Sequence, residues 1–148
     1  MVSQSRNLVP AERPQSRLHT LEVETFARET CKDITREIDK LIAASGIVDG
    51  VCHIFAMHTT AAILINENDD PAFTQDLNDF LARVAPRDHR YRHNDGNCDA
   101  HLKASLIGSS KAILVESSRL VLGRWQGIYL AEFDGPRRRT LKVKIVAD

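Results

Sequence analysis

The stretch that decides the fold is KAILVESSRLVLGRWQGIYLAEFDGPRRRTLKVKIV, residues 111–146. It holds three apolar, strand-like runs, at residues 112–116, 125–133 and 139–146, and the short segment 119–123 joins the first two. Strands that follow one another without an intervening helix are typical of an antiparallel sheet. The stretch therefore favours an α+β fold with a mostly antiparallel sheet over a doubly wound parallel one.

Upstream of this stretch, helical and extended patterns alternate. Three- and four-residue spacing of apolar residues predicts a helix over 26–45, with Gly46 as its C-terminal stop. An Asp-Asp-Pro start followed by spaced apolar residues predicts a second helix over 70–84. We expect the remaining elements as follows: a strand over 16–24, a strand over 51–58, an extended stretch over 59–68, a polar loop over 86–97 and a short helix over 98–107.

Length and composition limit the classes of protein. The 148 residues fit a single domain. Lys plus Arg and Asp plus Glu number 20 each, so the chain lacks the basic excess of a nucleic-acid-binding protein. No apolar run is long enough for a transmembrane helix, and residues 1–16 lack a signal peptide's apolar segment, so we expect a flexible lead-in there. Three cysteines without a C-x-x-C pair indicate a reducing, cytoplasmic setting.

His58 stands out among the six histidines. It ends a predicted strand on the same face as Cys52, Ile54 and Ala56, because side chains alternate along a strand. A polar ring on such a face is either a core histidine bonded to the backbone or a functional group. We expect His19, His53 and His89 to be ordinary surface residues.

The segment RHNDGNCDAH, residues 92–101, places two further histidines around a polar turn. Asp95-Gly96 is a turn pair that tolerates positive φ, so it can fold His93 back toward His101. Together with His58 these imidazoles would form an open divalent-metal site with a vacant position for water or substrate. The alternative is a solvated turn that binds nothing.

Other polar residues have either a possible functional role or a structural one. Glu67 has no capping role, so it is a candidate general base or a partner for an imidazole. Asp69 and Asp70 are expected to cap the helix that follows them. The run 137–139, three arginines, either holds a phosphate or forms the solvated start of the last strand.

Three long motifs in order resemble the YjbQ-like family, also called the secondary thiamine-phosphate synthase family. They are HTTAAILINENDDP (58–71), RHNDGNCDAHLKASLIGSS (92–110) and LVLGRWQGIYLAEFDGPRRR (120–139), and the resemblance extends over residues 17–146. It implies a single domain over 17–148 with a β-sandwich-like sheet, two main helices and one short helix. It also implies a homotrimer and a histidine-lined site for an anion or a divalent metal, zinc before magnesium.

The resemblance also assigns roles to residues. The metal ligands would be His58, His93 and His101, and the catalytic residues Glu67, Asp99 and Lys103. The residues that would bind the cofactor or ligand are Asn66, Asn97, Arg124 and Gln126. Arg124 stands where the family pattern has a small Thr, which suggests a different or more anionic ligand.

Two functions follow from this reading. The first is an enzyme that acts on a phosphorylated or anionic small molecule, by joining a pyrimidine pyrophosphate to a thiazole phosphate. The second is a non-catalytic homotrimer that binds a metal or a metabolite. Neither function involves nucleic acid or a membrane.

Overall fold

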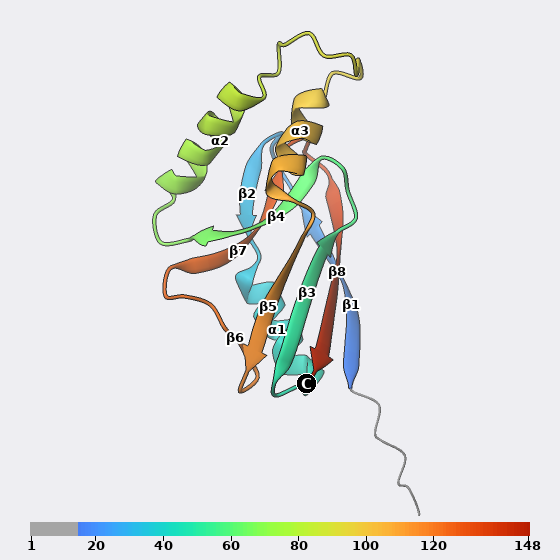
Figure 1. The fold of residues 1–148 in the computed structure, drawn as a ribbon, viewed down its shortest axis with the longest axis vertical. Helices are drawn as coiled ribbons and strands as arrows, with labels where there is room; N and C mark the ends of the chain where they lie inside the picture. The colour runs from blue at the N-terminus through green and yellow to red at the C-terminus, as the bar shows by residue number, and fades with distance from the viewer. Residues whose placement is uncertain (1–14) are drawn as a thin grey trace, which may run out of the picture.

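The computed structural model describes residues 15–148. Within that range the chain forms eight strands and three helices (Figure 1). In chain order they are β1 (Ser16–Glu24), β2 (Thr30–Asp33), α1 (Thr35–Ser45), β3 (Gly50–Ala56), β4 (Ala61–Glu67), α2 (Ala72–Val84), α3 (Cys98–Ile107), β5 (Ser110–Glu116), β6 (Arg119–Leu120), β7 (Gln126–Glu132) and β8 (Arg138–Ala147).

The strands form two antiparallel sheets. The larger sheet has the order β1-β8-β3-β5-β6, and the smaller one has the order β2-β7-β4. The fold is thus α+β, and every strand pair is antiparallel, which confirms the fold class expected from the C-terminal stretch.

The core explains why these elements pack in layers. Alternate residues of β3 are buried and meet Ile38 and Ile42 of α1, both of which are fully buried. Burying each such isoleucine contributes roughly 1.5–3 kcal/mol. On the small sheet, Ile128 and Leu130 of β7 join this cluster, whereas the alternating Ala131 belongs to a second cluster with residues of α2 and α3. The small sheet therefore lies between α1 with the large sheet on one face and α2 with α3 on the other.

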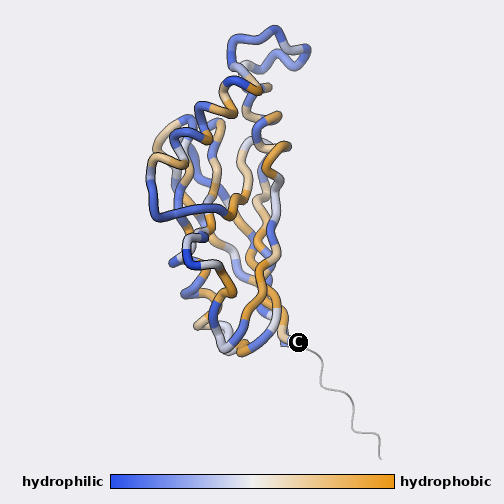
Figure 2. The backbone as a smooth tube through the Cα atoms, turned by 60° about the vertical axis from the view of Figure 1, so that its left-hand side comes forward, coloured by the Kyte–Doolittle hydropathy of each residue, from blue (hydrophilic) through white to orange (hydrophobic). Residues whose placement is uncertain are grey.

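Two predicted helices match the structure closely. The helix expected over 70–84 is α2, whose N-cap is Pro71, and Asp70 Oδ1 accepts a hydrogen bond from the Ala72 N–H at 2.9 Å. The helix expected over 98–107 is α3. The polar loop between them extends beyond the sheets as a hydrophilic segment (Figure 2). This loop carries His93, so it determines where the RHNDGNCDAH motif lies.

The helix predicted over 26–45 was wrong in nearly its first half, residues 26–34. Phe26 is 84% exposed, and Thr30–Asp33 form β2, which pairs with β7. The helix begins only at Thr35, whose N–H and hydroxyl both donate to Asp33 Oδ1. Pairing with a distant strand thus replaced a local helical pattern, while Gly46 ends the helix at φ 73° as predicted.

Other expectations differ in smaller ways. The strand expected over 51–58 ends at Ala56, so His58 follows the strand instead of lying within it. The lead-in expected over 1–16 falls outside the described residues up to residue 14, and Ser16 already belongs to β1. In the part of the chain that the structure describes, no helix combines the length and apolar character needed to span a membrane.

Candidate functional site

A hollow of about 490 Å³ lies where β4 begins and α3 packs against it. We call it the histidine hollow, and its walls are His58, Thr59, Ala61, His101, Ala104, Ser105, Gly108 and Ser109. The polar side chains in this lining are imidazoles and hydroxyls, and none is a carboxylate. Such a wall offers hydrogen-bond donors without negative charge.

His58 is held by the backbone of the large sheet. Its Nε2 accepts a hydrogen bond from the Thr140 N–H on β8 at 2.7 Å. The ring is half-buried, and burial together with the nearby positive charge of Arg139 lowers the pKa of His58 below its usual value. His58 is therefore a neutral imidazole at neutral pH, with one nitrogen already used.

A buried ion pair lies beside His58. Glu132 and Arg139 are both nearly inaccessible, and Arg139 donates to both carboxylate oxygens of Glu132. Arg139 Nη2 also donates to Thr60 Oγ1 at 2.8 Å, which ties the segment after His58 to β8. Burial alone would raise the pKa of Glu132, but the bonds from Arg139 and from the Asp134 N–H hold it below its usual value. Arg139 is thus neither a solvated residue nor a free phosphate ligand, the two alternatives that the sequence left open.

The Asp95-Gly96 turn brings His93 to His101. Gly96 has φ 78°, and the two imidazole centroids lie 5.0 Å apart at an interplanar angle of 44°. His101 lines the histidine hollow, whereas His93 lines a separate hollow of about 370 Å³ in the loop, together with Arg87, Arg90 and Tyr91. The turn chemistry predicted from the sequence is therefore present, but the three imidazoles do not all line one hollow.

Within residues 15–148, no three His, Cys, Asp or Glu side chains are grouped so that they could hold one metal ion. His58 and His101 share a hollow, and His93 contacts His101, but the three rings do not converge. A single copy of the chain therefore offers at most an imidazole pair, which does not fit the open three-histidine site that the spacing suggested.

Asp99 and Lys103 form a buried charge cluster with Arg28 and Glu29. Lys103 Nζ lies 2.6 Å from Glu29 Oε1 and 3.1 Å from Asp99 Oδ2, and Arg28 donates to both oxygens of Asp99. Asp99 and Lys103 are each 1% exposed. Burial alone would raise the pKa of Asp99, but the bonds from Arg28 and Lys103 hold it below its usual value. In this chain both residues are fully occupied with structural partners.

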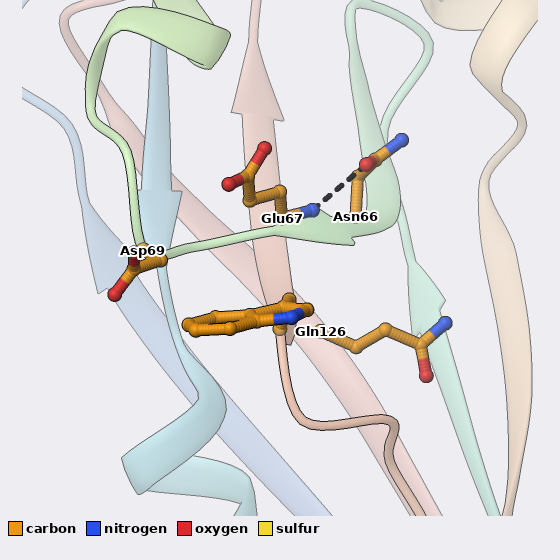
Figure 3. Close-up of a pocket in the computed structure, with 5 residues that line it drawn as sticks. Asn66, Glu67, Asp69 and Gln126 are labelled. Atoms are coloured by element: carbon orange, nitrogen blue, oxygen red, sulfur yellow. Dashed lines mark hydrogen bonds between the residues drawn. The ribbon is translucent and has the colours of Figure 1, made fainter.

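Glu67 and its neighbours lie at the other end of β4. Asn66, Glu67, Asp69, Trp125 and Gln126 line a hollow of about 330 Å³, which we call the tryptophan hollow (Figure 3). Since β4 runs from Ala61 to Glu67, the two hollows are separated by roughly 20 Å of strand. One chain therefore does not bring Glu67 to the histidines.

The side chains around the tryptophan hollow are partly engaged with one another. The Glu67 N–H donates to Asn66 Oδ1 at 2.8 Å, and Gln126 Oε1 accepts from the Gly123 N–H at 2.7 Å. The Arg124 guanidinium lies 4.7 Å from the Trp125 ring, where it stacks on an indole that is 50% exposed. This hollow is an open surface feature whose aromatic ring is accessible to a partner.

Asn97, the remaining predicted residue, precedes α3. Its Nδ2 donates to Asp134 Oδ2 at 2.9 Å, while its Oδ1 is buried without a partner among the described residues. It lines neither of the two hollows. Sequence reasoning missed Ser105 and Ser109 as site residues, since serine in a helix or a turn carries no distinguishing pattern, and for Thr59 it preferred an ordinary strand position over anion binding.

Comparison with known proteins now identifies the family. The profile of the family described as "UPF0047 protein YjbQ-like" matches residues 19–148. The chain belongs to this family. A UPF0047 protein of Methanocaldococcus jannaschii is 45% identical over 131 residues, which cover 88% of this chain and 95% of that protein. The UPF0047 protein YugU of Bacillus subtilis is 45% identical over 130 residues, which cover 87% and 98%.

Solved structures agree with the family assignment. A YbjQ-like protein of unknown function from Sulfolobus solfataricus superposes with a TM-score of 0.88 at 32% identity, covering 92% of this chain and all of the other. A YjbQ/UPF0047-family protein from Clostridium acetobutylicum gives a TM-score of 0.84 at 46% identity, covering 86% and 98%. The YjbQ-like chain is thus similar to these proteins in both sequence and fold.

Proposed function

We propose that this YjbQ-like protein binds a phosphorylated small molecule in the histidine hollow and transfers a group on it. The observation that carries the proposal is the lining of that hollow: imidazoles and hydroxyls from His58, Thr59, His101, Ser105 and Ser109, without a carboxylate. An oxyanion gains hydrogen bonds from such donors and meets no like charge. The hollow, about 490 Å³, lies within the usual size range of small-molecule sites.

The reaction we propose joins a pyrimidine pyrophosphate to a thiazole phosphate, with release of pyrophosphate. The leaving pyrophosphate gathers negative charge as its bond to carbon breaks, so donors fixed around its oxygens stabilise that state more than the ground state. His101, Ser105 and Ser109 would supply these donors. As the thiazole nitrogen forms its bond to that carbon, His101 would also donate a proton to the departing pyrophosphate, because no carboxylate lines the hollow.

The divalent metal implied by the family resemblance does not fit the described residues of one chain. The three imidazoles do not converge, so we derive no step through a metal. Asp99 and Lys103 have a structural role in this proposal, since each is buried in the charge cluster. Their ion pairs hold α3 against the segment before β2, and α3 carries His101 and Ser105 into the hollow.

We include a homotrimer in the proposal. Glu67, Asn66, Arg124 and Gln126 belong to or flank the tryptophan hollow, about 20 Å of strand away from the histidines. A residue at that distance acts on the same ligand only if a second copy supplies it. The accessible Trp125 is the kind of side chain that fills such an interface.

The test is product formation by the purified full-length protein. Supplied with both precursors, it should form thiamine phosphate, and His101→Asn should abolish that activity. The matched control is His53→Asn on β3, an exposed histidine outside the hollow, which should leave the activity unchanged. Absence of thiamine phosphate from the wild-type protein overturns the named reaction.

The second function, a binding protein without turnover, is favoured by one observation. The two acidic residues expected to move protons are a buried Asp99 bound to Arg28 and Lys103 and a Glu67 far from the hollow. Calorimetry with inorganic phosphate separates the two functions. If phosphate binds to the wild type but not to His101→Asn, and the wild type forms no thiamine phosphate from the two precursors, the binding function is established and the transferase is excluded.

A further inference from the structure

We infer that His58 presents an Nδ1–H donor to the histidine hollow, so that it recognises an oxyanion directly and does not coordinate a metal ion. The inference builds on the proposed function, because it concerns the ligand of the same hollow. It departs from the metal-ligand role that the spacing and the family resemblance suggest for His58. The decisive contact is the Thr140 N–H, which donates to His58 Nε2 at 2.7 Å.

This contact determines the tautomer. A backbone N–H can only donate, so the ring nitrogen facing it must accept with its in-plane lone pair. A neutral imidazole has one nitrogen that accepts and one that carries hydrogen. With Nε2 as the acceptor, the hydrogen of His58 is on Nδ1.

The backbone of Thr140 is fixed by two hydrogen bonds. Its N–H donates to His58, and its carbonyl oxygen accepts from the Met57 N–H at 3.2 Å. Its neighbour Arg139 is clamped to Thr60 and to Glu132 in the buried ion pair. The segment of residues 57–60 is therefore bonded to β8 on either side of His58, which holds the imidazole beside the Thr140 N–H.

The other ring nitrogen is accessible, and we place it toward the hollow that His58 lines. His58 Nδ1 has no hydrogen-bond partner among the described residues. The buried polar atoms that lack a partner there are His19 Nε2, Asn78 Oδ1 and Asn97 Oδ1, so the unpartnered Nδ1 of His58 is not buried. His58 itself lines the hollow, where the hydroxyl residues Thr59 and Ser109 accompany it. An accessible N–H beside two hydroxyls is suited to phosphate oxygens.

Metal coordination would require the opposite arrangement. A metal ion needs a ring nitrogen with a free lone pair, and the lone pair of Nε2 already faces Thr140. Coordination through Nδ1 would move the hydrogen to Nε2, where it would point at the Thr140 N–H, donor against donor. A buried N–H would then lose its acceptor, which is costly. The geometry thus selects an anion over a cation at His58.

Nitrogen-15 NMR of the labelled, full-length protein tests the inference. Long-range ring correlations distinguish a protonated Nδ1 from a protonated Nε2, and His58→Gln identifies the signals. We expect a protonated Nδ1 that stays unchanged with excess zinc and shifts when inorganic phosphate is added. A protonated Nε2, or a zinc-induced shift of either His58 nitrogen, overturns the inference even if phosphate binds.

The same titration separates this inference from the proposed function. If phosphate shifts His101 but not His58, the donor role of His58 is wrong while the hollow still binds anions. If phosphate shifts neither histidine, the anion-binding function is wrong, and the recognition role of His58 fails with it.

Two substitutions at the same position provide a second test. The amide nitrogen of Asn lies at about the place of Nδ1, so His58→Asn retains a donor, whereas His58→Leu has none. Phosphate should bind to His58→Asn within a few-fold of the wild type and to His58→Leu about tenfold more weakly. His53→Asn, on the exposed side of β3, is the control for the substitution itself. Equal affinities of the Asn and Leu variants would contradict a donor at this position.

Discussion

Lys103→Met tests whether the buried charge cluster is structural. The substitution keeps a long, unbranched side chain in place of one that is 1% exposed, and removes its bonds to Glu29 and Asp99. Asp99 would keep Arg28, but one of its two cationic partners would be gone. Removing one partner of a buried ion pair costs about 3–5 kcal/mol, because the remaining charge stays buried without full compensation.

This free energy predicts a measurable change. For a chain of this size each kcal/mol lowers Tm by about 2–4 °C, so Lys103→Met should lower it by about 10 °C. Urea unfolding at neutral pH should give a lower midpoint with an unchanged slope. Lys40→Met on the exposed side of α1 is the matched control and should stay within about 0.5 kcal/mol of the wild type.

The outcome also decides between the two roles considered for Lys103. At a temperature where the variant is folded, phosphate binding should resemble that of the wild type, since Lys103 is not among the residues that line the histidine hollow. A loss of stability below about 1 kcal/mol, accompanied by a loss of binding or product formation, would refute the structural interpretation and restore Lys103 as a catalytic residue.

Three further predictions concern other parts of the molecule. Burial alone would raise the pKa of Glu132, but Arg139 holds it below its unfolded value of 4.5. The stabilisation from this lowered pKa is present above pH 4.5 and is lost as the pH falls through the lowered pKa. Glu132→Gln does not titrate, so its urea midpoint should change less over that acidic range than the midpoint of the wild type. Gly50→Ala should cost more than about 2 kcal/mol in urea unfolding, because its Cβ would lie 2.0 Å from a β8 carbonyl oxygen, whereas Gly46→Ala meets no atom and should cost about 1 kcal/mol from its φ of 73°. If the trimer combines the two hollows, unfolding the Glu67→Gln and His101→Asn chains and refolding them together should restore product formation that neither variant has alone. No recovery would show that the hollows act separately.

The local patterns of the sequence were sufficient for most elements. Side-chain alternation accounts for the burial in β3, β5 and β8, while β7 is a continuous apolar run buried on both faces. The helix α2 follows from the Asp-Pro start and helical spacing. The Asp95-Gly96 turn likewise brings His93 to His101 through local backbone chemistry. The motifs that resemble the YjbQ-like family were readable for the same reason, since each is a contiguous string.

Only the tertiary structure decided what the polar residues do. The partner of Asp99 is Arg28, 71 residues earlier, and the donor to His58 is Thr140, 82 residues later. No periodicity reports such contacts, because they depend on which strands and helices pack together. For the same reason the sequence grouped Glu67 with the histidines, whereas β4 separates them by roughly 20 Å. Residue type gave the available chemistry, and the positions of buried partners determined which groups remain free to use it.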